Sequence, residues 1–590
     1  MGARSARLIS GSSDYLVGDI LPLPTNLEHN DNGERFMKIY RSALLTILAV
    51  TCCAPGRAQD IVHDGEYRFL KAQHGEQWAK QDAAMDAKLA EIRESHGGRR
   101  PNILYVLIDD VSFGTMGNRA MNYVTGIATP RINKLAEEGL SLMRMYTEPS
   151  CTPTRTAFMT GRHPVRTGLQ EVKVALVGEG LAAEEVTIAE VLSEAGYNTS
   201  HVGKWHLGDI EQAYPHNQGF DRAFFPLHQQ VQLALMTREA AEANNLLGWH
   251  SSMQSGDFAI DEFFKPAGLV TGVEAEKGGL AREVDMEPGE EWTQAHYHSM
   301  NERYQRQVVE ELNRLAAMDE PFFLQYWPLY PINFVHDREQ NSSRNGGFMA
   351  EKLQLLDHWI GDLFDEVDKL GIADNTVVVF MADNGSFRQY AGTSGMSELI
   401  YRGGKAEHLE GGVRVDAFAL WPGVIEAGSA AGDMIHVSDL YTTFATIGQA
   451  TQYIPRDRII DGVDQTALLL EGEGNGRRDY VYVYEGPILR SVVKQEFKMH
   501  LPAPGVPGAG APVFNLLRDP REEAPIAPLI AQALWSGASF QDMVKRHMMM
   551  IAKYPHAALG KGVPYGGIEN LRPESKRAVK IFSSWQPPGK

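Results

Sequence analysis

The strongest constraint on the fold comes from continuous runs of apolar residues. Three such runs cover residues 102–108 (NILYVLI), 321–327 (PFFLQYW) and 375–381 (NTVVVFM). Runs without polar alternation are typical of strands that are buried on both faces of a parallel sheet. Helical patterns at residues 131–140 and 349–370 lie between these runs. Strands that alternate with helices predict an α/β fold, with a large, mostly parallel sheet sandwiched by helices.

The pattern changes after about residue 455. Residues 480–484 (YVYVY), 489–493 (LRSVV) and 513–517 (VFNLL) are typical of short antiparallel strands. The sequence therefore predicts a small C-terminal antiparallel α+β domain. The chain divides into four expected segments: an N-terminal extension with a signal peptide (1–58), a helical lead-in outside the core (59–98), a large α/β domain (99–454) and the small C-terminal domain (455–590).

The N-terminal segment contains the pattern of an export signal. Met37 opens a short basic stretch, residues 43–50 (ALLTILAV) form an apolar run, and Ala58 offers a cleavage position. We expect translation to start at Met37 and the protein to be exported, either periplasmic or secreted. Because the apolar run is too short to span a bilayer, no stable membrane insertion is expected. Two alternatives are an anchored protein with a cytoplasmic arm and a lipoprotein attached through Cys52.

The net charge restricts the class of partner. The chain has 56 Lys and Arg against 75 Asp and Glu, which gives a formal net charge of −19. A global charge of this sign argues against non-specific nucleic-acid binding. An anionic substrate must therefore be attracted by a local cluster of positive groups.

Polar oxygen ligands follow two of the apolar runs. Asp109 and Asp110 come after the first run, and Asp383 and Asn384 come after the run at 375–381. Open α/β sheets place their sites at the carboxyl ends of strands. A set of oxygen ligands suits a hard cation, Ca²⁺ or Mg²⁺, and does not suit zinc. Either pair alone could equally be a helix cap or a solvated turn.

The mature chain is expected to contain one cysteine. Cys52 and Cys53 lie in the predicted signal segment, so only Cys151 remains after cleavage. A lone cysteine in an exported protein has no disulfide partner, and it is therefore either buried and inert or chemically special.

The residues around Cys151 resemble the sulfatase signature: Cys or Ser, any residue, Pro, any residue and Arg, with Thr-Gly a few positions later. Residues 150–155 (SCTPTR) and 160–162 (TGR) match it. Further blocks that resemble the family are at residues 203–208 (GKWHLG), 404–405 with 410–414 (GK and EGGVR), and 516–523 (LLRDPREE). The resemblance implies an alkaline-phosphatase-like fold and marks residues 99–454 as the catalytic domain.

The resemblance also implies a role for each site residue. In the family, a maturation enzyme oxidises the cysteine to formylglycine, whose hydrate is the nucleophile. By this resemblance, the formylglycine made from Cys151 attacks the sulfur atom of the substrate, and Arg155 orients the aldehyde hydrate. His206 contacts the hydroxyl of the formylglycine and helps to break the hemiacetal that carries the sulfate. Lys204 and Lys405 bind the sulfate oxygens. The implied ligands of the cation are Asp109, Asp110, Asp383, Asn384 and Cys151. Taken singly, each lysine could be a solvated surface residue.

One part of the sequence departs from the family pattern. The family usually has a histidine about nine residues after the Phe-Phe pair of the 321–327 run, where Ile332 and Asn333 stand here. His336 is a candidate for that role as the acid that protonates the leaving group. Asn333 could instead bind sulfate, and His408 could contribute. His436 lies in a further block that resembles the family, and we expect it to be structural.

The leading hypothesis is an arylsulfatase-like hydrolase of sulfate esters. The alternative is a phosphonate or phosphate monoester hydrolase on the same scaffold. Two other classes are a non-catalytic binder of sulfated glycans, in which Cys151 stays a thiol, and a Cys/His protease. Residues 225–300 are acidic and have few strand signals, so we expect an insertion that shapes the substrate cleft.

Overall fold

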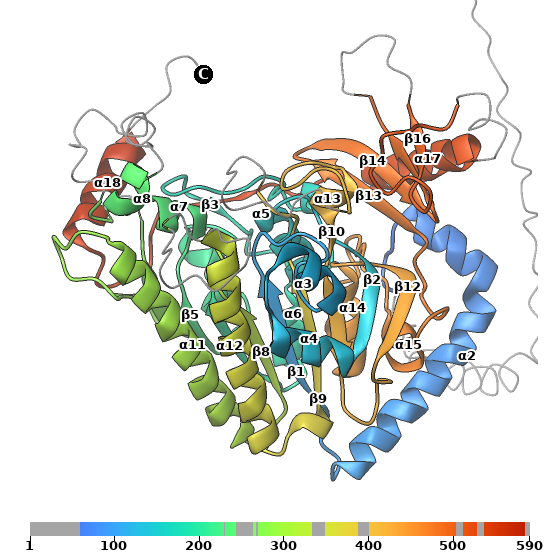
Figure 1. Cartoon of the computed structure of the whole chain (residues 1–590), viewed down its shortest axis with the longest axis horizontal. Coiled ribbons are helices and arrows are strands. Elements are labelled where there is room, and N and C mark those ends of the chain that lie inside the picture. Colours follow the sequence, from blue (N-terminus) through green and yellow to red (C-terminus); the bar gives the residue numbers. More distant parts are fainter. Residues whose placement is uncertain are drawn as a thin grey trace, which may run out of the picture. The chain divides into compact units, whose positions relative to one another are not determined.

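An eleven-stranded sheet forms the centre of the protein (Figure 1). The computed structural model describes residues 60–228, 230–243, 264–266, 269–332, 335, 348–387, 400–502, 511–527 and 536–584. The five central strands are parallel and lie in the order β9 (Thr376–Ala382), β1 (Asn102–Ile108), β8 (Phe322–Trp327), β4 (Asn198–Gly203) and β5 (Arg222–Phe225). Every residue of β1, β8 and β9 is buried, which confirms the prediction from the apolar runs.

The edges of this sheet are mixed. Beyond β9 lie β11 (Ala417–Leu420), β2 (Leu140–Tyr146), β10 (Arg414–Val415) and β12 (Ser429–His436), and beyond β5 lie β6 (Gly272–Glu276) and β7 (Arg282–Val284). Strands β6, β10 and β11 run antiparallel to their neighbours. Residues 225–300 contain few strand signals, and β6 and β7 were therefore not predicted. Both strands are short and rich in Gly, Glu and Arg.

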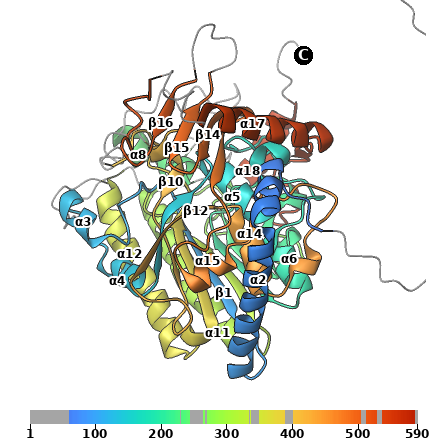
Figure 2. The same ribbon diagram turned by 90° about the vertical axis from the view of Figure 1, so that its right-hand side faces the viewer.

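Helices cover both faces of the large sheet, as predicted. One face carries α4 (Pro130–Glu137), α11 (Gln294–Ala316) and α12 (Phe348–Lys369); the other carries α5 (Cys151–Thr160), α6 (Ile188–Glu194) and α14 (Asp439–Ile447). Figure 2 shows α4 and α12 on one side of the sheet and α6 and α14 on the other. This arrangement leaves the ends of the central strands free to carry a site.

A second, smaller sheet follows near the C-terminus. It is an antiparallel meander of β13 (Tyr480–Glu485), β14 (Ile488–Lys494), β15 (Phe497–His500) and β16 (Val513–Asn515). Helix α17 (Ser536–Lys553) packs on it through Phe540 and Met543. The small antiparallel sheet was predicted. The boundary at 454/455 stays a prediction, since residues 61–590 form one compact unit.

The helical lead-in is part of the core. The helix is α2 (Gly65–Ser95), and the expectation that it lies outside the core is wrong. Met85 and Leu89 belong to the hydrophobic core of the large sheet. Tyr67 and Trp78 belong to a second hydrophobic cluster, which also contains side chains of β13, β14 and α17. The polar composition concealed this packing, because the buried side chains are widely spaced along the helix.

The expected signal segment, with Met37 and Ala58, lies outside the described residues. Within the residues that are described, no helix is both long and apolar enough to cross a membrane.

Candidate active site

The two polar pairs meet at the carboxyl edge of the central strands. Strands β1 and β9 pair in parallel with Ile108 opposite Ala382, so the residues that follow them lie side by side. The backbone N–H of Asp110 donates to Asp383 Oδ1 at 3.0 Å. Asp109, Asp110, Asp383 and Asn384 are all completely buried. The sequence expectation that these side chains converge agrees with the structure.

Cys151 is the first residue of α5 and is completely buried. Its Sγ lies 3.3 Å from Asp109 Oδ1 and 3.5 Å from Asp110 Oδ1, and Lys405 Nζ donates to it at 2.9 Å. Burial and these two carboxylates raise the pKa of the thiol well above its usual value. Reactive cysteines have a lowered pKa. The unmodified thiol is therefore poorly suited to attack, which disfavours the protease hypothesis.

Two buried cations surround Asp109. Lys204, directly after β4, places Nζ 2.6 Å from Asp109 Oδ2. Arg155, one turn after Cys151 in α5, places Nη2 3.3 Å from the same oxygen and 3.0 Å from Asp383 Oδ2. Burial alone would raise the pKa of Asp109, but Lys204 and Arg155 hold it well below its usual value. Asp109 is therefore ionised and firmly positioned.

Lys405 reaches the site from a separate loop. Its Nζ donates to Asp110 Oδ2 at 2.8 Å, and its backbone N–H donates to Ser386 O at 3.0 Å. Burial lowers the pKa of this lysine, but Asp110 outweighs burial and raises it well above its usual value. The lysine is therefore charged beside Cys151.

His206 has one ring nitrogen fixed and one unpaired. Nε2 bonds the Lys173 carbonyl at 2.9 Å, and Thr152 Oγ1 donates to the carbonyl of His206 at 3.0 Å. Nδ1 is buried and has no hydrogen-bond partner in the part of the chain that the structure describes. Burial and Lys204 lower the pKa of His206 well below its usual value. The ring is therefore neutral, with Nε2–H donating and a lone pair on Nδ1.

The polar cluster is suited to a hard cation. Asp109, Asp110, Cys151 and Asp383 offer ligand atoms that lie within 4.8 Å of one another. Asn384 Nδ2 donates to Asp110 Oδ1 at 2.7 Å, but Asn384 Oδ1 is buried without a partner among the described residues. Burial and the charge of Asp109 raise the pKa of Asp383 to about 7. Crowded carboxylates and an unsatisfied amide oxygen fit Ca²⁺ or Mg²⁺.

Of the four remaining candidates, the structure describes only His408 and His436, and it places neither of them in this cluster. Asn333 and His336 lie outside the described residues. His408 instead bonds Glu485 through Nδ1 at 2.5 Å and through its backbone N–H at 2.9 Å. His436 stands at the end of β12 and bonds Ser438.

Two serines that the sequence analysis missed link the loops that carry the two polar pairs. Ser112 Oγ donates to Ser386 Oγ at 2.8 Å, and the backbone N–H of each residue donates to the hydroxyl of the other. Each serine stands two positions after the second residue of a polar pair, Asp110 or Asn384. This equal spacing was the available signal.

Comparison with known proteins agrees with this geometry. The sulfatase family model matches residues 101–450. Human arylsulfatase A is 33% identical over 395 residues, covering 65% of this chain and 71% of that protein. Steryl-sulfatase from Rattus norvegicus is 29% identical over 513 residues, covering 73% and 86%. The crystal structure of PsFucS1 sulfatase from Pseudoalteromonas sp. superposes with a TM-score of 0.72 at 27% identity, covering 82% and 96%.

The family match includes every described residue to which the resemblance assigns a role, from Asp109 to Lys405. The same residues converge at one edge of the large sheet. The chain therefore belongs to the sulfatase family and is a sulfuric ester hydrolase.

Proposed function

We propose that the protein is an arylsulfatase-like enzyme that hydrolyses sulfate esters. The nucleophile would be a formylglycine hydrate made from Cys151, and a divalent cation would hold the sulfate. The observation that carries the proposal is the position of Cys151, buried at the start of α5 between two carboxylates and Lys405. Because the pKa of the thiol is raised, a thiolate nucleophile is disfavoured. Modification of the side chain removes this difficulty.

The modified residue requires a partner enzyme. We propose that a formylglycine-generating enzyme acts on the segment SCTPTR before folding closes over it, since Cys151 is buried in the folded chain. When formed, the hydrated aldehyde supplies one oxygen for attack on sulfur and a second hydroxyl that allows the sulfate to be released.

The protein's own cations are placed to bind the sulfate. Lys204 and Lys405 are both buried and lie on either side of the carboxylates, with Nζ atoms on Asp109 and Asp110 respectively. Fixed positive charge in a dry site stabilises the charge that develops on sulfuryl oxygens. Arg155 pairs with Asp109 and Asp383, so its role is to hold both carboxylates in position.

His206 is suited to proton transfer. Its Nε2–H is fixed on the Lys173 carbonyl, and its neutral ring keeps a lone pair on Nδ1. We propose that Nδ1 accepts the proton of the hydroxyl that expels the sulfate.

Asp109, Asp110, Asp383 and Asn384 would hold the cation, Ca²⁺ or Mg²⁺. The unpaired Asn384 Oδ1 supports this ligand set. The cation, when bound, neutralises negative charge on the sulfate oxygens. The apolar run at 43–50 supports export of the enzyme, and we propose a periplasmic or secreted location.

The test compares matched esters of one phenol. We expect kcat/KM for the aryl sulfate to exceed that for the aryl phosphate and for the corresponding phosphonate monoester. Faster turnover of the phosphorus esters would favour the alternative hydrolase. Tight binding of sulfated compounds without turnover, in protein produced together with the maturation enzyme, would favour the binder.

A further inference from the structure

A second cluster of possible metal ligands lies beside the active-site cluster. It contains Glu148, which precedes α5, His163, which follows α5, and His436 at the end of β12. Each of the three is at most 1% exposed. The proposed sulfate chemistry uses none of them.

The three donor atoms have the separations expected around one small ion. Glu148 Oε1 lies 2.8 Å from His163 Nδ1 and 3.8 Å from His436 Nε2, and all three atoms lie within 4.8 Å of one another. Ligands bound to a tetrahedral zinc ion at about 2.0–2.1 Å are about 3.4 Å apart. The distance from Glu148 Oε1 to His163 Nδ1 is shorter than this value, and the distance to His436 Nε2 is longer. Small movements of these side chains would therefore accommodate an ion.

His436 Nε2 supplies an independent sign of a missing partner. It is buried and has no hydrogen-bond partner among the described residues, and it points toward Glu148 at a distance too long for a hydrogen bond. His436 Nδ1 bonds Ser438 Oγ at 2.8 Å and accepts the Ser438 backbone N–H at 3.3 Å. An ion bound at Nε2 would require the ring proton to stand on Nδ1, where Ser438 Oγ can accept it.

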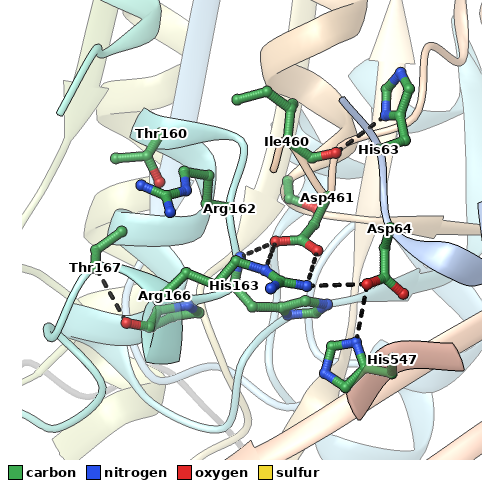
Figure 3. Close-up of polar contacts among 12 residues, drawn as sticks. His63, Asp64, Thr160, Arg162, His163, Arg166, Thr167, Ile460, Asp461 and His547 are labelled. Carbon is green, nitrogen blue, oxygen red and sulfur yellow. Dashed lines mark hydrogen bonds and ion pairs between the residues drawn. The ribbon is translucent and has the colours of Figure 1, made fainter. Parts of the chain in front are cut away.

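The buried arginine next to the cluster is paired with carboxylates. Figure 3 shows His163 beside Arg166, whose guanidinium pairs with Asp461 and Asp64. The His163 backbone N–H donates to Asp461 Oδ2 at 2.8 Å. The two carboxylates therefore offset the Arg166 guanidinium, and a cation bound beside it would not face an unpaired positive charge.

We propose that Glu148, His163 and His436 bind a structural divalent transition-metal ion, with zinc preferred, at a site distinct from that of the active-site cation. Two imidazoles and one carboxylate are ligands that suit zinc, whereas the oxygen-rich active-site cluster suits Ca²⁺ or Mg²⁺.

An ion at this site would stabilise the segment that carries the nucleophile. Glu148 stands three residues before Cys151. Thr154 Oγ1 lies within hydrogen-bond distance of the Glu148 carbonyl, at 3.0 Å, and of the Asp383 carbonyl, at 2.7 Å, and its single proton can be donated to either. The ion would therefore fix the entry to α5 relative to the loops that carry the two polar pairs.

The direct test is metal analysis of the full-length protein produced in zinc-supplemented medium. We expect about one zinc ion per chain to remain after gel filtration. Anomalous scattering from crystals at the zinc absorption edge should place it between Glu148, His163 and His436. This measurement needs no variant. Zinc-supplemented protein without zinc, or with the anomalous peak elsewhere, would overturn the proposal and leave a hydrogen-bonded Glu–His–His cluster.

Variants then assign the ligands. Substitution of a residue that only hydrogen-bonds a metal ligand typically lowers metal affinity about 10–100-fold. Glu148→Gln and His436→Gln each remove a ligand, so each should lower zinc affinity by more than this. Ser438→Ala should fall within that range. His228→Gln is the matched control, because His228 is also a buried histidine and bonds Tyr565 at 2.7 Å.

An active-site control separates the two metal sites. Asp109→Asn should retain zinc even though it loses activity. Zinc that stays with Glu148→Gln and His436→Gln but leaves Asp109→Asn would assign the ion to the active site and refute the second site.

Discussion

Replacement of Lys204 by methionine should remove most of the activity and leave the fold intact. Lys204 is completely buried and its Nζ lies 2.6 Å from Asp109 Oδ2, so its charge acts in a medium of low dielectric constant. Loss of one such stabilising group typically raises the barrier by about 2.7–4 kcal/mol, which lowers kcat about 100- to 1,000-fold. Asp109 keeps Arg155 at 3.3 Å, so no buried carboxylate is left unpaired.

The assay measures kcat for an aryl sulfate together with thermal unfolding. Lys494→Met is the matched control, because Lys494 also pairs with buried or half-buried carboxylates, Glu66 at 2.8 Å and Asp479 at 2.7 Å, but belongs to the small sheet. The control should lose stability and keep kcat. The reasoning is refuted if Lys204→Met keeps more than about a tenth of the wild-type kcat, or if Lys494→Met loses as much.

Three further predictions concern the cation, the end of α5 and acid stability. A chelator should abolish turnover, and Ca²⁺ or Mg²⁺ should restore it; full activity after chelation would argue against the cation. Gly161→Ala should destabilise the protein by at least about 1–3 kcal/mol in denaturant unfolding, because Gly161 has φ +66° and an added Cβ would lie 2.6 Å from the Tyr441 ring. Burial raises the pKa of Glu522, but Lys498 and His500 outweigh it and lower the pKa from 4.5 to about 2. This stabilisation is complete above pH 4.5 and is lost as the pH falls toward 2. Glu522→Gln should therefore reduce the slope of unfolding free energy against pH between pH 4.5 and about 2. An unchanged slope would contradict the assignment.

The sequence predicted the centre of the fold and the meeting of the two polar pairs because both depend on local pattern. The apolar runs of β1 and β9 define two buried strands, and the residues after them must meet at one edge of a parallel sheet. The motif around Cys151 indicated it as the candidate nucleophile, and the further blocks that resemble sulfatases indicated Lys204 and Lys405 as candidates; the structure places both lysines beside the carboxylates that contact Cys151.

The remaining features depend on contacts between distant parts of the chain. The packing of α2 uses a sparse apolar face, with Trp78, Met85 and Leu89 at helical spacing, and the many polar residues between them weaken this signal. Strands β6 and β7 exist because β5 offers them an edge. Glu148 and His436 meet only because β12 pairs with β2, with His436 opposite Tyr146.

The most direct test of the central claim is the mass of the tryptic peptide from Met145 to Arg155, taken from active protein made in its own host. Conversion of Cys151 to formylglycine removes sulfur and two hydrogens and adds one oxygen. We predict that this mass change is present, and that the converted fraction equals the catalytically active fraction. An intact cysteine in fully active protein would contradict the proposed nucleophile.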